Sequence, residues 1–235
     1  MYLGIDLGTS SIKCLLIDDN QKTLATSSHD FTISTPKSGW AEQDPSFWIN
    51  GLSKCLNVLN KNVDFKKILS ISFSGQMHGA TCLNQEGKII RPSILWNDTR
   101  SFKECESMMD INPDIMDITG NLAMPGFTAP KIAWMREHEP EAFKAIDKVL
   151  LPKDYLRFYL SNEFFTYMSD ASGTYWLNVG ERKWSKKLLD LCDLTEDNMP
   201  QLCEGTAQTG VVSKKIAETY GFDYACKIIG GAGDN

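Results

Sequence analysis

Two aspartates occur where an apolar run gives way to a glycine turn, one near each end of the chain. The first run continues into Asp6-Leu7-Gly8, and the second continues into GGAGDN, which contains Asp234. Short apolar runs bounded by glycine are typical of buried strands, so we expect both carboxylates at strand ends. A single chain can bring two such ends into one cleft. The pair therefore predicts an α/β fold with a shared acidic site.

The turn after Asp6 has the composition of an anion-binding loop. Gly8 allows close backbone approach, and Thr9 and Ser10 add hydroxyl groups. Backbone N–H groups in such a turn form a nest for phosphate, and the Asp6 carboxylate can hold the hydrated Mg²⁺ of a nucleotide. By itself this motif is weak, because aspartate and glycine are common in structural turns. It predicts phosphoryl transfer without a Walker loop.

Size and charge exclude several classes of function. The 235 residues suffice for a substantial core and predict two subdomains. A net charge of −6 with scattered basic residues disfavours nucleic acid and anionic membrane surfaces as partners. No apolar run approaches the roughly 18 residues of a membrane span, and Met1 leads directly into a strand rather than into a signal segment. We expect a cytoplasmic protein.

The cysteines suggest neither a disulfide framework nor a zinc site. They number seven, are widely spaced, and do not form a CxxC pair. We expect buried thiols in a reducing compartment.

The order of predicted elements is strands, a helix, more strands, a long helical region and a final strand. Asp44 followed by Pro45 predicts a capped helix start. We expect a core from residues 1–100 and 225–235, and a mainly helical insertion over 101–224. The predicted strands cover 2–5, 12–17, 23–28, 68–73, 80–83 and 225–229, and the helices of the insertion cover 129–147, 152–160, 185–192 and 211–220.

Two polar clusters follow predicted strands. Gln76, Met77 and His78 lie between glycines after the 68–73 strand, which favours a polar-ligand site over the usual structural roles of His and Met. Trp96 and Asn97 belong to ILWNDTR, where an indole can pack on a sugar ring while amides and carboxylates bind hydroxyls. A turn with a surface ion pair explains that second cluster equally well.

The terminal GGAGDN supplies the second acidic position. Its glycines allow a substrate to approach the backbone, Asp234 can accept a hydroxyl proton, and Asn235 can hold the same sugar. Positioning and charge neutralisation contribute most of the catalysis of phosphoryl transfer, so the turn at 8–10 matters as much as the base.

Taken together, the motifs resemble the N-terminal half of the FGGY carbohydrate kinases along the whole chain. The resemblance rests on DLGTSSIK, SGQMHGA, ILWNDTR, TGNLAMPGFTAPKIAW, LPKDYLRFYL, MSDASGTYWL and GGAGDN, in this order. SGQMHG and TGNLAMPGFTAPK are the most specific of these. The resemblance implies a ribonuclease H-like fold within the actin, Hsp70 and sugar kinase superfamily.

It also implies site roles. Asp6 would lie by Mg²⁺ and the transferred phosphate, and residues 8–10 would contact phosphate. Met77 and His78 would bind a ketose, and Asp234 would be the catalytic base with Asn235 beside it. The implied substrates are ATP and a sugar, with D-xylulose first and ribulose, gluconate or glycerol as alternatives.

Family members continue after the GDN motif with a second domain that provides most of the adenosine site. Because this sequence ends at Asn235, we expect a sugar-binding half that is poorly active alone. A catalytically silent module that binds a sugar or forms a homodimer is the alternative. A hydrolase is disfavoured, since the sequence has no GxSxG, HExxH or P-loop motif.

Overall fold

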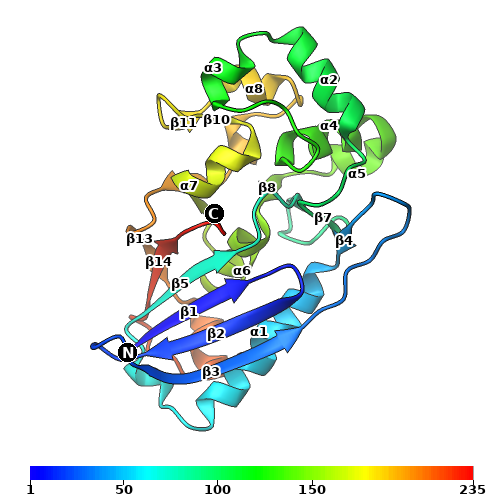
Figure 1. Ribbon diagram of the computed structural model, residues 1–235. Helices are drawn as coiled ribbons and strands as arrows, with labels where there is room; N and C mark the ends of the chain where they lie inside the picture. Colours follow the sequence, from blue (N-terminus) through cyan, green and yellow to red (C-terminus); the bar gives the residue numbers. More distant parts are fainter. Residues whose placement is uncertain (235) are drawn as a thin grey trace.

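The computed structural model describes residues 1–234, and its main feature is a twisted mixed sheet (Figure 1). Within these residues the sheet has six strands in the order β13-β14-β5-β1-β2-β3. Their bounds are β1 (Tyr2–Leu7), β2 (Ser11–Ile17), β3 (Thr23–Asp30), β5 (Ser70–Gly75), β13 (Gln208–Val211) and β14 (Lys227–Gly231).

The first three strands, all predicted, form an antiparallel meander. Leu3 pairs with Leu16 and Ile5 with Cys14, and all four side chains are buried. Asp6 pairs with Lys13 on the opposite, exposed face. The alternation of buried and exposed residues along β1 and β2 is that of a sheet with one covered face.

Three neighbouring strands of the sheet run parallel. β1 pairs with β5 from Tyr2 opposite Ser70 to Leu7 opposite Gly75, and β14 lies parallel on the other side of β5. The carboxyl ends of parallel strands meet at one edge. The segments that follow β1, β5 and β14 therefore emerge together, although they are far apart in sequence.

Helices α1 (Pro45–Asn60), α6 (Pro152–Ser161) and α9 (Lys214–Tyr220) contribute to the core on the covered face. As predicted, the Asp44 side chain accepts a hydrogen bond from the Ser46 N–H at 2.8 Å, and Pro45 is the first helical residue. Trp48, Leu52 and Leu56 of α1 are fully buried with the sheet.

A second hydrophobic core lies in the region shown above the sheet in Figure 1. It is formed mainly by short elements between residues 80 and 199. The remaining elements are α2 (Phe102–Ile111), α3 (Ile115–Thr119), α4 (Thr128–His138), α5 (Pro140–Lys144), α7 (Met168–Ala171), α8 (Lys186–Asp190), the 3₁₀ turns Phe65–Lys67, Ser172–Thr174 and Glu196–Asn198, and the strands β4 (Glu42–Gln43), β6 (Thr81–Leu83), β7 (Ser93–Ile94), β8 (Lys148–Leu150), β9 (Phe165–Tyr167), β10 (Leu177–Asn178), β11 (Lys183–Trp184) and β12 (Gln201–Cys203).

Two predicted boundaries are wrong. The predicted helix over 129–147 is divided into α4 and α5 at Pro140, whose ring cannot continue a helix. The predicted helix over 211–220 begins only at Lys214, because residues 208–211 form β13 against β14. This strand, α6 and α9 belong structurally with the sheet, and the domain division at residues 101 and 224 remains a proposal.

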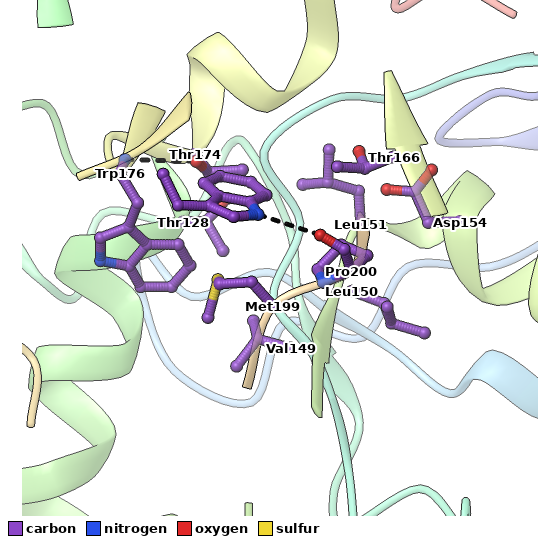
Figure 2. Close-up of a pocket in the computed structure, with 11 residues that line it drawn as sticks. Thr128, Val149, Leu150, Leu151, Asp154, Thr166, Thr174, Trp176, Met199 and Pro200 are labelled. Atoms are coloured by element: carbon purple, nitrogen blue, oxygen red, sulfur yellow. Dashed lines mark hydrogen bonds between the residues drawn. The ribbon is translucent and has the colours of Figure 1, made fainter. Parts of the chain in front are cut away.

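A small cavity of about 10 Å³ is lined by side chains of α6 and of the second hydrophobic core, among others (Figure 2). Asp154, Thr166, Thr128 and Trp176 line it together with apolar residues of β8 and the segment before β12. A cavity of this volume can hold at most about one water molecule. This cavity is too small to hold a sugar.

Two further expectations concern cysteines and membrane insertion. All seven cysteines are buried, as predicted. Among residues 1–234, no helix combines the length and apolarity needed to cross a membrane.

Candidate functional site

The predicted acidic positions lie beyond or near the ends of parallel strands. Asp6 is the penultimate residue of β1 and is exposed, and Gln76 follows β5 directly. Asp234 is exposed three residues beyond β14. Since β14, β5 and β1 are adjacent, their ends form one edge of the sheet. Asn235 lies outside the described residues.

The predicted phosphate turn is held by buried side chains. Gln43, only 1% exposed, donates from Nε2 to the carbonyl oxygens of Thr9 at 3.2 Å and Thr32 at 3.0 Å. The Trp48 indole in turn donates to Gln43 Oε1 at 2.6 Å. Ser10 remains exposed at the start of β2. The turn is thus pre-organised by the core beneath it, as a phosphate site requires.

Trp96 connects this turn to the second polar cluster. Its side chain is 47% exposed, and its Nε1 donates to Thr9 Oγ1 at 2.9 Å. The indole is therefore held in one orientation while part of its ring remains available to a ligand. This is the arrangement expected of an aromatic platform for a sugar.

Met77, His78, Trp96 and Asn97 line one cavity of about 310 Å³. Two motifs about 20 residues apart were predicted separately as ligand sites, and the structure brings them together. The volume is at the lower end for small-molecule pockets. The other lining residues were not individually predicted: Asp98, Thr99, Met124, Pro125, Gly126 and Phe127.

His78 is positioned by its backbone and by its ring. It adopts φ 65°, and its carbonyl oxygen accepts hydrogen bonds from Thr128 Oγ1 at 3.1 Å and Lys131 Nζ at 3.0 Å. Its ring stacks on Phe127 at 4.8 Å between centroids. A Cβ on Gly173 would lie 2.7 Å from His78 Nε2, so only glycine permits this close approach.

The environment of His78 keeps its imidazole neutral. Burial, and then the charge of Lys131, lower the pKa of His78 to about 4. A neutral imidazole offers one donor and one acceptor, which suits a hydroxyl-bearing ligand. Burial also lowers the pKa of Lys131 to about 7, while its Nζ donates to the carbonyl oxygens of Gly126, Phe127 and His78.

Gln76 lies at the end of β5 with an unsatisfied side chain. The residue is 2% exposed, and within residues 1–234 neither its Oε1 nor its Nε2 has a hydrogen-bond partner. Its backbone N–H donates to Leu7 O at 2.7 Å, which ties β5 to β1. A buried amide without partners requires a ligand or water to complete it.

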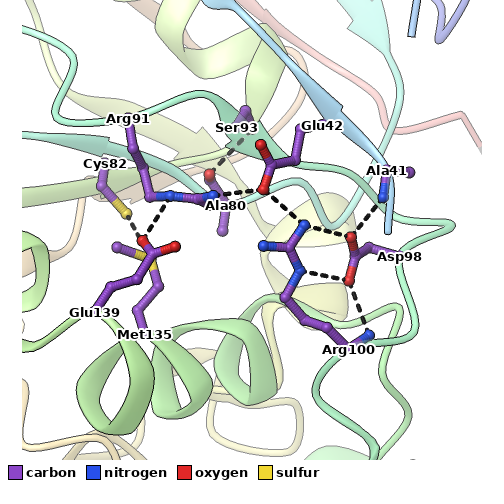
Figure 3. A network of polar contacts seen from close by, with 10 residues as sticks. All are labelled: Ala41, Glu42, Ala80, Cys82, Arg91, Ser93, Asp98, Arg100, Met135 and Glu139. Atoms are coloured by element: carbon purple, nitrogen blue, oxygen red, sulfur yellow. Dashed lines mark hydrogen bonds and ion pairs between the residues drawn. The ribbon is translucent and has the colours of Figure 1, made fainter. Parts of the chain in front are cut away.

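A network of ion pairs supports the loop that contains Trp96 and Asn97 (Figure 3). Asp98 Oδ2 accepts from Ala41 N at 2.6 Å and from Arg100 at 2.7 Å. Glu42 bridges Arg100 at 2.7 Å and Arg91 at 2.5 Å. Arg100 also stacks on Trp40. The polar cluster of ILWNDTR therefore serves both structure and site.

The segment that contains Asp234 passes a buried charge cluster. Lys153 Nζ contacts Asp154 Oδ1 at 2.8 Å and Asp170 Oδ2 at 2.5 Å. A Cβ on Gly233 would lie 3.1 Å from Asp170 Oδ1. Burial raises the pKa of Asp170, and Asp154 and Asp234 raise it further, whereas Lys153 opposes this. Sequence reasoning missed these residues, although they belong to the quoted motifs LPKDYLRFYL and MSDASGTYWL.

Asp6 lines a second cavity of about 430 Å³ on the exposed face of the sheet. Lys13, Ser72, Ser74 and Gly231 also line this cavity, and the two serines supply hydroxyl oxygens in addition to the Asp6 carboxylate. Of the residues that the structure describes, those lining the two cavities do not include Asp234.

The whole described chain matches one family model. The model for the N-terminal domain of the FGGY family of carbohydrate kinases matches residues 1–235. A xylulose kinase from Escherichia coli (strain K12) is 44% identical over 235 residues, which are 100% of this chain and 48% of that protein. A xylulose kinase from Lactococcus lactis is 41% identical over 236 residues, covering 99% of this chain and 47% of that protein.

Solved structures of carbohydrate kinases are also similar to this chain over nearly its whole length. A xyloylose kinase from Brucella ovis is 45% identical with a TM-score of 0.97, covering 100% of this chain and 49% of that chain. A gluconate kinase from Lactobacillus acidophilus is 28% identical with a TM-score of 0.93, covering 99% of this chain and 48% of that chain. The chain spans about half the length of the curated relatives that it matches.

Proposed function

The chain belongs to the FGGY family of carbohydrate kinases, and from this premise we propose that it is the sugar-binding half of an ATP-dependent xylulokinase. Its fold is that of the actin, Hsp70 and sugar kinase superfamily, as predicted. The proposed reaction of a protein of the relatives' length is transfer of the γ-phosphoryl group of ATP to a hydroxyl of D-xylulose. The observation that carries the proposal is the cavity in which His78 and Trp96 meet beside the Thr9 turn.

We assign sugar binding to this cavity. Trp96 offers an indole face, neutral His78 offers one donor and one acceptor, and Asn97 offers an amide. Met77 supplies an apolar wall. Gln76, assigned to the sugar from the sequence, does not line this cavity, and its buried amide has no hydrogen-bond partner within residues 1–234. Such a mixture of apolar surface with a few fixed polar groups is typical of sites for small polar ligands. Asn235 is proposed for the same role from the sequence.

Phosphate and metal binding are assigned to the neighbouring turn. The N–H and hydroxyl groups of Gly8, Thr9 and Ser10 would face phosphate oxygens. Asp6 is exposed beside the hydroxyls of Ser72 and Ser74, and such hard oxygen donors fit hydrated Mg²⁺. The bound ion would neutralise phosphate charge. The residues of this chain would orient the phosphate relative to the sugar hydroxyl.

Asp234 is proposed as the general base. An exposed carboxylate after a glycine-rich strand end can accept the proton of a hydroxyl that attacks phosphorus. The buried Asp170 carboxylate faces the preceding Gly233 and thereby limits the conformations of this segment. The O–P bond to the sugar forms as the bond to the leaving ADP oxygen breaks.

Another sugar or sugar acid is the second candidate substrate. The gluconate kinase from Lactobacillus acidophilus and a ligand-bound xylulose kinase from the same organism have equal TM-scores of 0.93 and equal identities of 28%. Backbone similarity at this level does not discriminate between the two substrates. The discriminating contacts must come from side chains in the cavity.

Calorimetric titration tests the proposal on this chain. We expect saturable binding of D-xylulose, weaker binding of ribulose, gluconate and glycerol, and loss of binding in His78→Asn. His29→Asn is the matched control, because His29 lies on β3, and we expect it to bind normally. Preferential binding of gluconate would replace the proposed substrate. Equal binding in both histidine variants would remove His78 from the site.

A further inference from the structure

Three potential metal ligands lie together on helices α2 and α4. They are Glu104 in the first turn of α2 and Glu137 and His138 at the end of α4. One ligand atom from each lies within 4.8 Å of those from the other two. None of these three residues lines the proposed sugar cavity or the cavity of Asp6. The cluster therefore has no part in the site already described.

One oxygen of the Glu104 carboxylate is buried and unpaired within residues 1–234. The residue is 7% exposed, and its Oε2 has no hydrogen-bond partner among the described residues. Burying an unpaired charge costs several kcal/mol, so such groups are normally paired or bound to metal. Burial raises the pKa of the Glu104 carboxyl and Glu137 adds to this rise, whereas the Glu104 backbone N–H, His138 and Lys103 oppose it. A cation between the two carboxylates would remove both unfavourable effects.

His138 has the tautomer and the orientation of a metal ligand. Its Nδ1 lies 3.1 Å from the Trp134 carbonyl oxygen, which can only accept, so Nδ1 carries the proton. In the neutral ring Nε2 is then left with a free lone pair. The imidazole also stacks on the Trp134 ring, with 4.7 Å between the ring centroids and an interplanar angle of 6°. Metal-binding histidines usually donate their second ring N–H to a carbonyl or carboxylate in this way.

Other charged groups near the cluster have their own partners or are exposed. Glu139 pairs with Arg91 at 2.8 Å, and Arg100 pairs with Asp98 and Glu42. Lys37 and Lys103 line a surface cavity that Glu104 and His138 also line, and both lysines are exposed. In residues 1–234 no ion pair within 4.0 Å involves Glu104, Glu137 or His138. The three ligands are thus available together.

We propose that Glu104, Glu137 and His138 bind a divalent transition-metal ion, with Zn²⁺ the best match. Zn²⁺ binds both imidazole nitrogen and carboxylate oxygen, whereas Mg²⁺ and Ca²⁺ prefer oxygen alone. Tetrahedral zinc requires ligand atoms roughly 3.3 Å apart, given bonds of about 2.0–2.2 Å. The exposed side chains of Glu137 and His138 can make this adjustment. The ion would link α2 to α4.

Zinc titration by calorimetry, with excess Mg²⁺ present, tests the site on the chain as it exists. We expect one saturable site in the parent chain and at least about tenfold weaker binding in Glu104→Gln and in His138→Gln. Glu106→Gln on the exposed side of α2 and His29→Gln are matched controls that should bind as the parent does. Binding that is unchanged in both ligand variants would overturn the proposal, as would the absence of saturable binding in the parent.

Cobalt substitution distinguishes this site from the seven cysteines. We expect a visible Co²⁺ spectrum without thiolate-to-metal charge-transfer bands, and we expect it to disappear in His138→Gln. Strong thiolate bands that persist in His138→Gln would assign the metal to cysteine and overturn the proposal. Thermal unfolding of each variant without metal verifies that the fold is retained. His138 is exposed, so its substitution should leave that unfolding temperature nearly unchanged.

Discussion

Two buried carboxylates six residues apart, Asp98 and Glu104, have opposite surroundings. Asp98 is 1% exposed and accepts hydrogen bonds from Ala41 N and from the Arg100 backbone and guanidinium. Glu104 is 7% exposed, and its buried Oε2 has no partner in the described part of the chain. The first carboxylate is completed by the fold itself. The second has the surroundings of a group completed by a ligand.

The same difference separates the supports of the sugar cavity from its contact groups. The Glu42, Asp98 and Arg100 network pairs its carboxylates with guanidinium groups and holds the loop of Trp96, although Arg100 Nη1 has no hydrogen-bond partner within residues 1–234 (Figure 3). Gln76 is buried with neither side-chain polar atom paired within the same residues. The ion pairs therefore build the scaffold here, and the Gln76 amide is to be tested as a ligand contact.

Removing the paired carboxylate should have the largest effect. In Asp98→Ala the buried Arg100 guanidinium loses one of its two carboxylate partners and the Ala41 N–H loses its acceptor, so the free energy of unfolding should fall by about 3–5 kcal/mol. Urea denaturation measures this change. Asp110→Ala, at an exposed position on α2, should change it by less than about 0.5 kcal/mol. A small loss of unfolding free energy in Asp98→Ala would contradict the difference between Asp98 and Glu104.

Acid should destabilise the protein through His78, a group kept neutral by its surroundings. Its folded pKa of about 4 lies below the ordinary value of 6.5, so the unfolded chain binds the proton first as the pH falls. Stability is then lost between pH 6.5 and 4, by at most about 3.5 kcal/mol at about 1.4 kcal/mol per pKa unit. Above pH 6.5 His78 is neutral in both the folded and the unfolded chain, so it does not contribute to the pH dependence of stability there.

Denaturation curves of the parent and His78→Gln over this pH range measure that contribution. The variant should lose less stability than the parent as the pH falls from 6.5 to 4, because glutamine does not titrate. Other acidic groups titrate in both proteins and cancel in the difference. Identical pH dependence in the two proteins would show that His78 is not shielded from protonation.

Replacing the unpaired carboxylate should have the smallest effect and the opposite sign. Without added metal, Glu104→Met should raise the free energy of unfolding by about 1–2 kcal/mol, since an apolar side chain of similar length removes an unpaired buried charge. Urea denaturation in chelator measures this change. If the variant is instead destabilised by several kcal/mol, Glu104 has a protein partner and the contrast with Asp98 is lost.

Local patterns were sufficient for much of the fold. Apolar runs at residues 2–5 and 12–17 predicted the first two strands, and Asp44-Pro45 predicted the start of α1. The break at Pro140 was also readable from proline chemistry but was missed. β13 could not be found in this way, because its four residues QTGV acquire strand geometry only by pairing with β14. Short strands depend on partners that are distant in sequence.

The sequence by itself determined which residue types could carry chemistry and where strands end. The motifs identified residues 76–78 and 96–97 as candidate contacts, and 8–10 as a phosphate turn, because side-chain chemistry and glycine geometry are local properties. Only the tertiary structure decided that Trp96 bonds to Thr9, that Lys131 supports His78, and that Glu104 is left unpaired. Burial and pairing arise from contacts between distant segments, and these contacts set the pKa values and the unsatisfied groups on which the proposed sites depend.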